Sequence, residues 1–184
     1  MITALAGRRV DEVGTEPPCF PIENVSLVRA RLRTLLRERE VSGLVCSAAC
    51  GADLLALDAA GELGLRRRII LPFERSRFRD VSVTDRPGDW GPLFDRIVDE
   101  VGTAGDLVVI GDAAMDDDAY ATANAQILNE TERLAEESQR QALTVIVWDG
   151  RSRGEGDLTA QLADDARRRG LTVAEVSTLK DSGA

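Results

Sequence analysis

Five small residues, SAACG at residues 47–51, form a turn that could bind an anion. An apolar run ends at this turn, and a helical pattern begins directly after Gly51. The first N–H groups of a helix carry partial positive charge and lack partners inside the helix, so they bind phosphate groups readily. We therefore expect Ser47, Ala48 and Gly51 to contact an anionic ligand. The alternative is a tight turn in which small residues only allow close packing.

Two further turns carry groups that suit an anion. Arg8 follows the first apolar run in the sequence GRR, and its planar guanidinium can contact a phosphate through two hydrogen bonds. A solvated surface arginine is the alternative. The stretch WDGRSRGEGDLT, residues 148–159, leads from another apolar run into the last helical pattern. Neither a GxGxxG sequence nor a P-loop is present. The residues assigned to these two turns are Gly7, Arg8, Asp149, Gly156 and Thr159.

Other side chains could contact a nucleoside. Asp53 could accept a hydrogen bond from a ribose hydroxyl, or it could only favour the helix dipole. Tyr120 and Asn124 are one helical turn apart and share a face, where they could stack on and hydrogen-bond a base or pack in the core. Arg79 could close over the ligand as part of a flap. For the acidic run 116–118 we expect a charge-favoured helix start, because consecutive carboxylates diverge too much to share a metal ion.

Composition excludes several kinds of site. The 184 residues include no histidine, which excludes Ser-His triads, Cys-His dyads and histidine metal sites. A net charge of −9 argues against an extended nucleic-acid surface. No apolar run approaches the roughly 20 residues of a membrane span. Three cysteines are an odd number, so we expect a reduced, cytoplasmic protein. We expect neither a metal nor a cofactor.

Apolar runs alternate with helical patterns along the sequence. The strands and helices that this alternation predicts hold the turns described above in place. Several runs are continuously apolar, which is typical of parallel strands covered on both faces. The sequence therefore predicts a single doubly wound, mostly parallel Rossmann-like α/β domain with helices on both faces, over residues 1–178, and a frayed tail over 179–184. The expected strands are residues 2–6, 43–47, 68–73, 106–110, 143–148 and 171–176. The expected helices are about residues 24–40, 52–63, 90–101, 117–137 and 158–169.

Local features of these elements lead to three further predictions. Segment 74–89 shows no clear period, so we expect it to be irregular, with Asp89 as the cap of the helix that follows. The helix at 52–63 is apolar nearly all round and should be buried on more than one side. Together with an aromatic content of 4%, this helix suggests apolar surface that one domain does not cover. We therefore expect a homodimer.

Five motifs in this order resemble the SLOG group of Rossmann-like domains, relatives of the DprA/Smf and LOG (lysine decarboxylase-like) proteins. The motifs are AGRRVD, SAACGADLLALDAA, ILPF, AYATANAQIL and VIVWDGR followed by GDLTA, and they span about residues 2–176. The sequence looks most similar to SLOG domains of bacterial signalling proteins. That resemblance implies binding of a nucleotide or nucleotide-derived ligand, and an effector or TPR-type partner. The residues it implicates are Ser47, Ala48, Gly51 and Thr159.

Two positions depart from the resemblance. Relatives often have a histidine where Arg8 stands, and a glycine where Asp157 stands. An aspartate at that place would oppose a phosphate unless it faced away. LOG enzymes also carry a glutamate three residues after their threonine, and this position is Leu162 here.

Three functions remain open from the sequence. The first is a sensor module that binds a nucleotide-like ligand, and the second is an interaction domain whose ligand site has decayed. The third is a LOG-like nucleoside monophosphate phosphoribohydrolase. Because the LOG acid is missing at Leu162, we expect a binding module rather than an enzyme, and we assign no catalytic residue.

Overall fold

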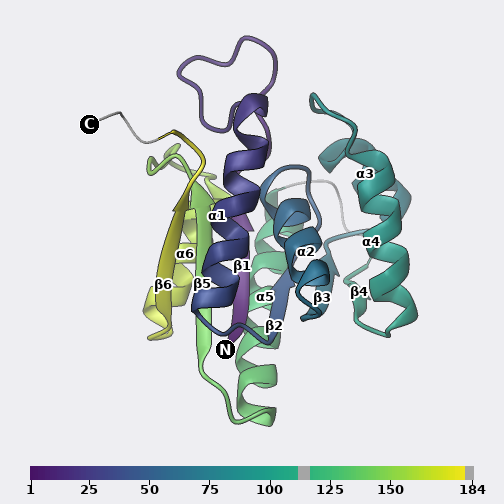
Figure 1. Ribbon diagram of the computed structural model, residues 1–184, viewed down its shortest axis with the longest axis vertical. Coiled ribbons are helices and arrows are strands. Elements are labelled where there is room, and N and C mark those ends of the chain that lie inside the picture. Colours follow the sequence, from purple (N-terminus) through teal and green to yellow (C-terminus); the bar gives the residue numbers. More distant parts are fainter. Residues whose placement is uncertain (112–116, 181–184) are drawn as a thin grey trace.

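Six parallel strands form the central sheet of the computed structural model, which describes residues 1–111 and 117–180. The strands are β1 (Ile2–Gly7), β2 (Gly43–Cys46), β3 (Arg66–Leu71), β4 (Leu107–Val109), β5 (Ala142–Trp148) and β6 (Thr172–Ser177). Their order is β4-β3-β2-β1-β5-β6, and every pairing is parallel (Figure 1). The fold class predicted from the sequence is confirmed. All the carboxyl ends therefore lie at one edge of the sheet.

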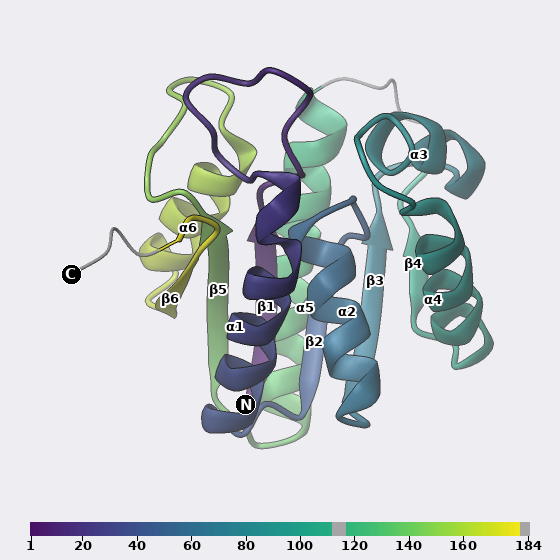
Figure 2. The same ribbon diagram turned by 45° about the horizontal axis from the view of Figure 1, so that its top comes forward.

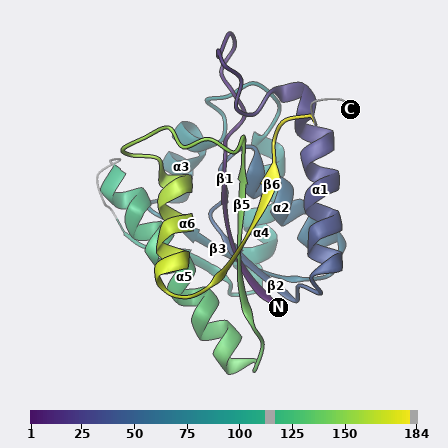
Figure 3. The same cartoon turned by 90° about the vertical axis from the view of Figure 1, so that its left-hand side faces the viewer.

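Helices cover both faces of this sheet (Figure 3). They are α1 (Val25–Glu38), α2 (Ala52–Glu62), α3 (Arg75–Ser82), α4 (Gly91–Thr103), α5 (Asp117–Glu137) and α6 (Leu158–Arg168), with a short 3-10 helix at Ile22–Asn24. One face carries α5 and α6, and the other carries α1, α2 and α4. Cover on both faces explains why the strands are apolar runs rather than alternating ones. Among the described helices, none combines the length and apolar character needed to cross a membrane.

The apolar helix α2 is buried within its own chain. It packs against α1, α4 and the strands β1, β2 and β3. Burial on more than one side, as predicted, is therefore confirmed. The apolar residues of α2 that are buried are Ala52, Leu54, Leu55, Ala56, Leu57, Ala59 and Ala60. Because the described part of the same chain covers this helix, α2 offers no apolar face for a second copy, and the homodimer stays a prediction.

The segment after β3 contains a helix, α3, that the sequence pattern did not predict. Glu74 caps it, because its carboxylate accepts hydrogen bonds from two backbone N–H groups of the first turn. The helix has one large apolar anchor, since Phe78 is 1% exposed. The Phe78 ring lies 5.9 Å from that of Phe73 and 6.1 Å from that of Phe94. A two-turn helix with a single anchor gives no periodic signal, so the prediction of an irregular segment was wrong here.

The starts of β3 and α4 differ from the prediction for identifiable reasons. β3 begins at Arg66, two residues early, because Arg66 and Arg68 form ion pairs with Asp106 just before β4. Three consecutive arginines can therefore lie in a strand. α4 begins after Trp90, and no side chain caps it, so the prediction that Asp89 is its cap was wrong.

The segment that leaves β1 crosses directly over the start of α2. Gly51 has φ +90° and ψ −123°, and a Cβ there would lie 2.8 Å from the carbonyl oxygen of Arg8 and 2.9 Å from the nitrogen of Val10. A Cβ on Gly7 would lie 2.4 Å from the Cβ of Ala52. Both glycines are therefore required by close packing of the backbone, which is the alternative that the sequence left open for this turn.

We expect Gly51→Ala to lower the free energy of unfolding by at least about 3 kcal/mol, because its Cβ meets backbone atoms in a conformation that only glycine adopts easily. Gly14→Ala is the matched control. Gly14 also has a positive φ, +85°, but nothing lies within 4 Å of its Cβ position. Its substitution should cost about 1 kcal/mol. Urea unfolding measures both values, and equal costs would contradict a rigid crossing at Gly51.

Candidate functional site

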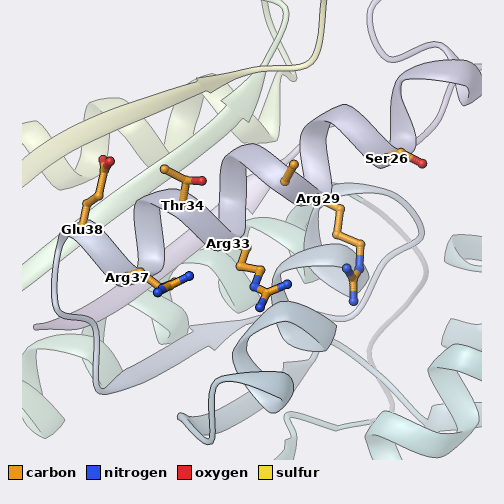
Figure 4. A pocket seen from close by; sticks show the side chains of 7 residues that line it. Ser26, Arg29, Arg33, Thr34, Arg37 and Glu38 are labelled. Atoms are coloured by element: carbon orange, nitrogen blue, oxygen red, sulfur yellow. The ribbon is translucent and has the colours of Figure 1, made fainter.

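Two hollows in the described part of the chain were compared as ligand sites. The larger, about 840 Å³, is a groove along α1 from which the side chains of Arg29, Arg33 and Arg37 project (Figure 4). All of its lining residues belong to this one helix, so it cannot enclose a ligand. The smaller, about 420 Å³, lies at the carboxyl ends of the strands and is lined from several elements. Ligand sites of open α/β sheets lie at this edge, which makes the smaller pocket the candidate site.

The candidate pocket lies where the strand order reverses. β1 pairs with β2 on one side and with β5 on the other. The helix after β1 covers one face of the sheet, and the helix after β5 covers the opposite face. The segments 8–21 and 149–157 arch above the sheet edge at this point (Figure 2). The pocket is consequently lined by the ends of β1 and its loop, by Ser47 after β2, and by residues of α2, α5 and α6.

Most of the predicted site residues line this pocket. They are Gly7, Arg8, Ser47, Asp53, Tyr120, Asn124, Gly156 and Thr159. The predicted residues outside the lining are Ala48, Gly51, Arg79 and Asp149. Ala48 and Gly51 are buried by packing, and Asp149 lies behind the wall as a partner of the arginine described below. The guanidinium of Arg79 is held by the carboxylate of Asp95 on α4, at 3.0 Å. That ion pair keeps Arg79 away from the pocket.

Three backbone N–H groups in and directly after the turn before α2 have partners in the protein. The N–H of Ala49 donates to the carboxylate of Asp53 at 3.2 Å. The N–H of Cys50 donates to the carbonyl of Ser82 at 2.9 Å. The next helical N–H, that of Ala52, donates to a carbonyl of the segment leaving β1 at 3.2 Å. An anion could use these N–H groups only by displacing their present partners.

Asp157 occupies the start of α6 as an internal anion. Its carboxylate accepts hydrogen bonds from the N–H groups of Thr159 and Ala160, at 3.1 and 3.2 Å. It also accepts one from the N–H of Arg153, at 2.8 Å. Asp157 therefore takes the place at which the N-terminus of a helix would hold the anion of a ligand, and it does not face away from the helix.

Arg8 is buried, at 3% exposure, and ties together three segments around the pocket. Its guanidinium donates two hydrogen bonds to Asp157 (2.7 and 2.9 Å), one to Asp149 (3.1 Å) and one to the carbonyl of Arg151 (2.6 Å). Burial acts to raise the pKa of Asp157, but the hydrogen bonds from Arg8 and from backbone N–H groups outweigh it and lower that pKa. The alternative of a solvated surface arginine was therefore wrong. A ligand phosphate at Arg8 would compete with two carboxylates.

Asp53 is a buried carboxyl group at the pocket wall, 7% exposed. Burial raises the pKa of Asp53 to about 7, against the lowering effect of the hydrogen bond from the Ala49 N–H. Ser47 lines the same pocket, and its hydroxyl oxygen is buried without a hydrogen-bond partner among the described residues. These two residues place polar atoms with unused hydrogen-bonding capacity beside the pocket.

Tyr120 and Asn124 form the wall on α5. The Tyr120 ring packs edge-on against Phe73, with centroids 5.6 Å apart, and its hydroxyl forms a hydrogen bond of 2.9 Å with Ser82. The side-chain nitrogen of Asn124 donates to the carbonyl of Leu158 at 2.9 Å, which leaves the side-chain oxygen for another donor. Both residues pack against the protein and also line the pocket. Core packing and contact with a ligand, the two roles considered from the sequence, are therefore compatible.

Residues of the loops and of α3 that were outside the predicted set complete the lining. They include Arg9, Val10, Asp11, Phe78, Ser82, Arg86, Arg153 and Glu155. Arg9 pairs with Asp85 at 2.8 Å, and Arg86 pairs with Glu12 at 2.9 Å. The signals in the sequence that could have indicated these residues were the second arginine of GRR and the charged run RSRGE. The acidic partners of Arg9 and Arg86, however, lie far from them along the chain. Of the acidic run before α5, Asp116 lies outside the described residues.

The comparison with known proteins shows that this chain is similar to them in fold only. No protein-family model and no curated protein matches the sequence. The structure is similar to DNA processing protein A (DprA) from Streptococcus pneumoniae, at 15% identity and a TM-score of 0.44, over 95% of this chain and 58% of that one. It is similar to TM1055 at 12% identity and a TM-score of 0.43, over 95% and 91% of the two chains.

A third similar structure is the molybdenum cofactor binding protein from the phototrophic bacterium Rippkaea orientalis. Its identity is 11% and its TM-score 0.32, over 94% of this chain and 87% of that one. This chain thus spans little more than half the length of DprA. Identities and TM-scores this low describe how the chain runs and carry nothing about ligand or activity.

We expect the free energy of unfolding to fall as pH rises, because of the buried carboxyl group of Asp53. The folded pKa of Asp53 is about 7 and its ordinary value is 3.8, so between these values the folded state holds a proton that the unfolded state has lost. Relative to Asp53→Asn, the parent should lose about 3 kcal/mol of unfolding free energy between roughly pH 5 and pH 8. Urea unfolding at both pH values measures this difference.

Asp58→Asn, on the outer side of α2, is the matched control. Burial acts to raise the pKa of Asp58, but hydrogen bonds from Arg29 and Arg96 outweigh it and lower that pKa. Its carboxylate therefore stabilises the fold throughout this pH range and loses the effect only as pH falls below its ordinary pKa of 3.8, so the control should show almost no change between pH 5 and pH 8. The same pH dependence for both variants would contradict the raised pKa of Asp53.

Proposed function

We propose that this chain is a SLOG-like sensor module that binds a nucleotide or nucleotide-derived small molecule in the pocket above β1 and β5. The single observation that supports the proposal most is the coincidence of the predicted residues with this pocket. Residues chosen from the turns, from Asp53 on α2 and from Tyr120 and Asn124 on α5 converge on one hollow of about 420 Å³. Small-molecule pockets typically have volumes of about 300–1,000 Å³.

The lining suits a ligand that has both a flat ring and polar groups. Tyr120 contributes aromatic surface, and Asn124, Ser47 and Asp53 contribute hydrogen-bonding groups. A few polar groups on a partly apolar wall are what orient a bound small molecule. This mixture favours a binding module over an interaction domain with a decayed site, since a decayed pocket would need no such arrangement.

A thermal-shift screen of nucleosides, nucleotides, cyclic dinucleotides and ADP-ribose derivatives tests the proposal. A ligand at 100 times its dissociation constant adds about 2.7 kcal/mol of stability, which should raise the Tm by about 5–10 °C for a chain of this size. Asn124→Leu keeps the branched outline of the side chain but removes its polar oxygen from the pocket wall, together with the hydrogen bond to the carbonyl of Leu158. This variant should lose most of the shift.

Arg33→Ala, in the groove along α1, is the control for the other hollow. It should keep the full shift, because that groove lies outside the candidate pocket. If the ligand-induced rise in Tm is lost in Arg33→Ala and kept in Asn124→Leu, the ligand binds in the groove along α1 instead. A panel without any stabilising compound would contradict the proposed function itself.

A phosphoribohydrolase is the second candidate, and Asp53 is the observation that favours it. A carboxyl group with a pKa of about 7 beside a pocket is suited to proton transfer at neutral pH. However, glycosidic cleavage usually needs two carboxyl groups across the bond. Asp157 is committed to Arg8 and to the helix start. Leu162, at the position of the LOG glutamate, is fully buried between α6 and the sheet.

We therefore expect no release of free base from AMP or related monophosphates. Chromatography after hours of incubation at high protein concentration measures the release. Asp53→Asn serves as the control for trace contamination, because a contaminating hydrolase would be unaffected by it. Release that saturates with substrate and disappears in Asp53→Asn would place the hydrolase first.

The proposed sensor role also requires a protein partner. An effector of the TPR type is the partner that the family resemblance implies, and a second copy of this chain is the other partner that we propose. A reduced, cytoplasmic setting fits the three cysteines, because Cys19, Cys46 and Cys50 are all free thiols.

A further inference from the structure

The two helix starts at the pocket are filled by the protein's own acidic groups. At α6, Asp157 accepts hydrogen bonds from the N–H groups of Thr159 and Ala160. At α2, Asp53 accepts the hydrogen bond of the Ala49 N–H. Helix starts of this kind are where an α/β sheet would hold a phosphate group. Here both carry a buried carboxyl group instead.

The arginines of the lining are largely neutralised as well. Arg8 is bound to Asp157 and Asp149. Arg9 and Arg86 are paired with Asp85 and Glu12 respectively. The lining contains four arginines, Arg8, Arg9, Arg86 and Arg153, and four acidic residues, Asp11, Asp53, Glu155 and Asp157. The pocket as a whole thus has no surplus of positive charge with which to recognise a phosphate.

Apart from the exposed Arg153 and Glu155, the groups that remain for a ligand are uncharged or only weakly acidic. The hydrogen bond of Asn124 to the carbonyl of Leu158 uses the side-chain nitrogen, and the side-chain oxygen has no donor among the described residues. The hydroxyl of Ser47 has no partner among the described residues. The ring of Tyr120 adds an aromatic surface to the same pocket. Such groups pair with hydroxyl, amide and heteroaromatic groups, which a nucleoside offers without its phosphate.

We infer that the pocket selects an uncharged nucleoside and discriminates against the same nucleoside carrying a 5′-phosphate. This inference rests on the proposed function and narrows its ligand class. A phosphate would have to displace Asp157 from α6 or lie beside the buried carboxyl of Asp53. Discrimination here comes from anionic groups that repel the wrong ligand, as well as from contacts to the right one.

Titration calorimetry at pH 8 with adenosine, guanosine, cytidine and uridine, each beside its 5′-monophosphate, tests the inference. At least one nucleoside should bind about tenfold or more tightly than its monophosphate. Asp53→Asn, which removes one carboxylate without changing the shape of the wall, should narrow this ratio. Asp58→Asn, on the outer side of the same helix, should leave the ratio as it is.

The outcomes separate the inference from the proposed function. Equal or tighter binding of the monophosphate would overturn the inference alone, because the pocket would still bind a nucleotide. An unchanged ratio in Asp53→Asn would overturn the role of the internal carboxyl groups. Binding of neither class of compound, in a protein that unfolds cooperatively, would overturn the proposed function and this inference with it.

Discussion

The buried contact between Arg8 and Asp157 is the constraint on which the candidate site depends. It joins the end of β1 to the start of α6, and Asp149 extends it into the loop after β5. Both charged groups are almost inaccessible to solvent. Removing either one would leave the other unpaired in a poorly solvated place, at a cost of about 3–5 kcal/mol. The two segments that arch over the sheet edge are consequently held in one arrangement, and the pocket walls follow from it.

The architecture of the site suits a charged ligand, but the side chains in this contact do not. The strand order, the reversal point beside β1 and the helix starts are those of a sheet that can hold a charged ligand. Yet Asp157 satisfies the start of α6, and Asp53 binds an N–H group of the turn before α2. A fold therefore offers a place for a ligand, while individual side chains decide which chemistry the place accepts.

Close packing is the second constraint, and it links the same elements. The backbone leaving β1 passes so near to Gly51 that no Cβ fits there, and it accepts the hydrogen bond of the Ala52 N–H. The position of Arg8 is set by this crossing, because Arg8 supplies the carbonyl in both contacts. The turn before α2 and the loop before α6 are therefore coupled through one residue. Neither can change its path without disturbing the other.

The sequence by itself determined the fold class, because continuously apolar strands and amphipathic helices repeat in a regular order that local pattern reveals. Most of the site residues that it named do line the pocket, since the carboxyl ends of parallel strands must share one edge, although they make up a minority of the lining. The tertiary structure alone decided the strand order, the short helix α3 anchored by Phe78, and the burial of Arg8 between Asp149 and Asp157. The physical reason is that these features depend on contacts between residues far apart in the chain. Nothing in the neighbourhood of Arg8 reveals that its partners lie some 140 to 150 residues away.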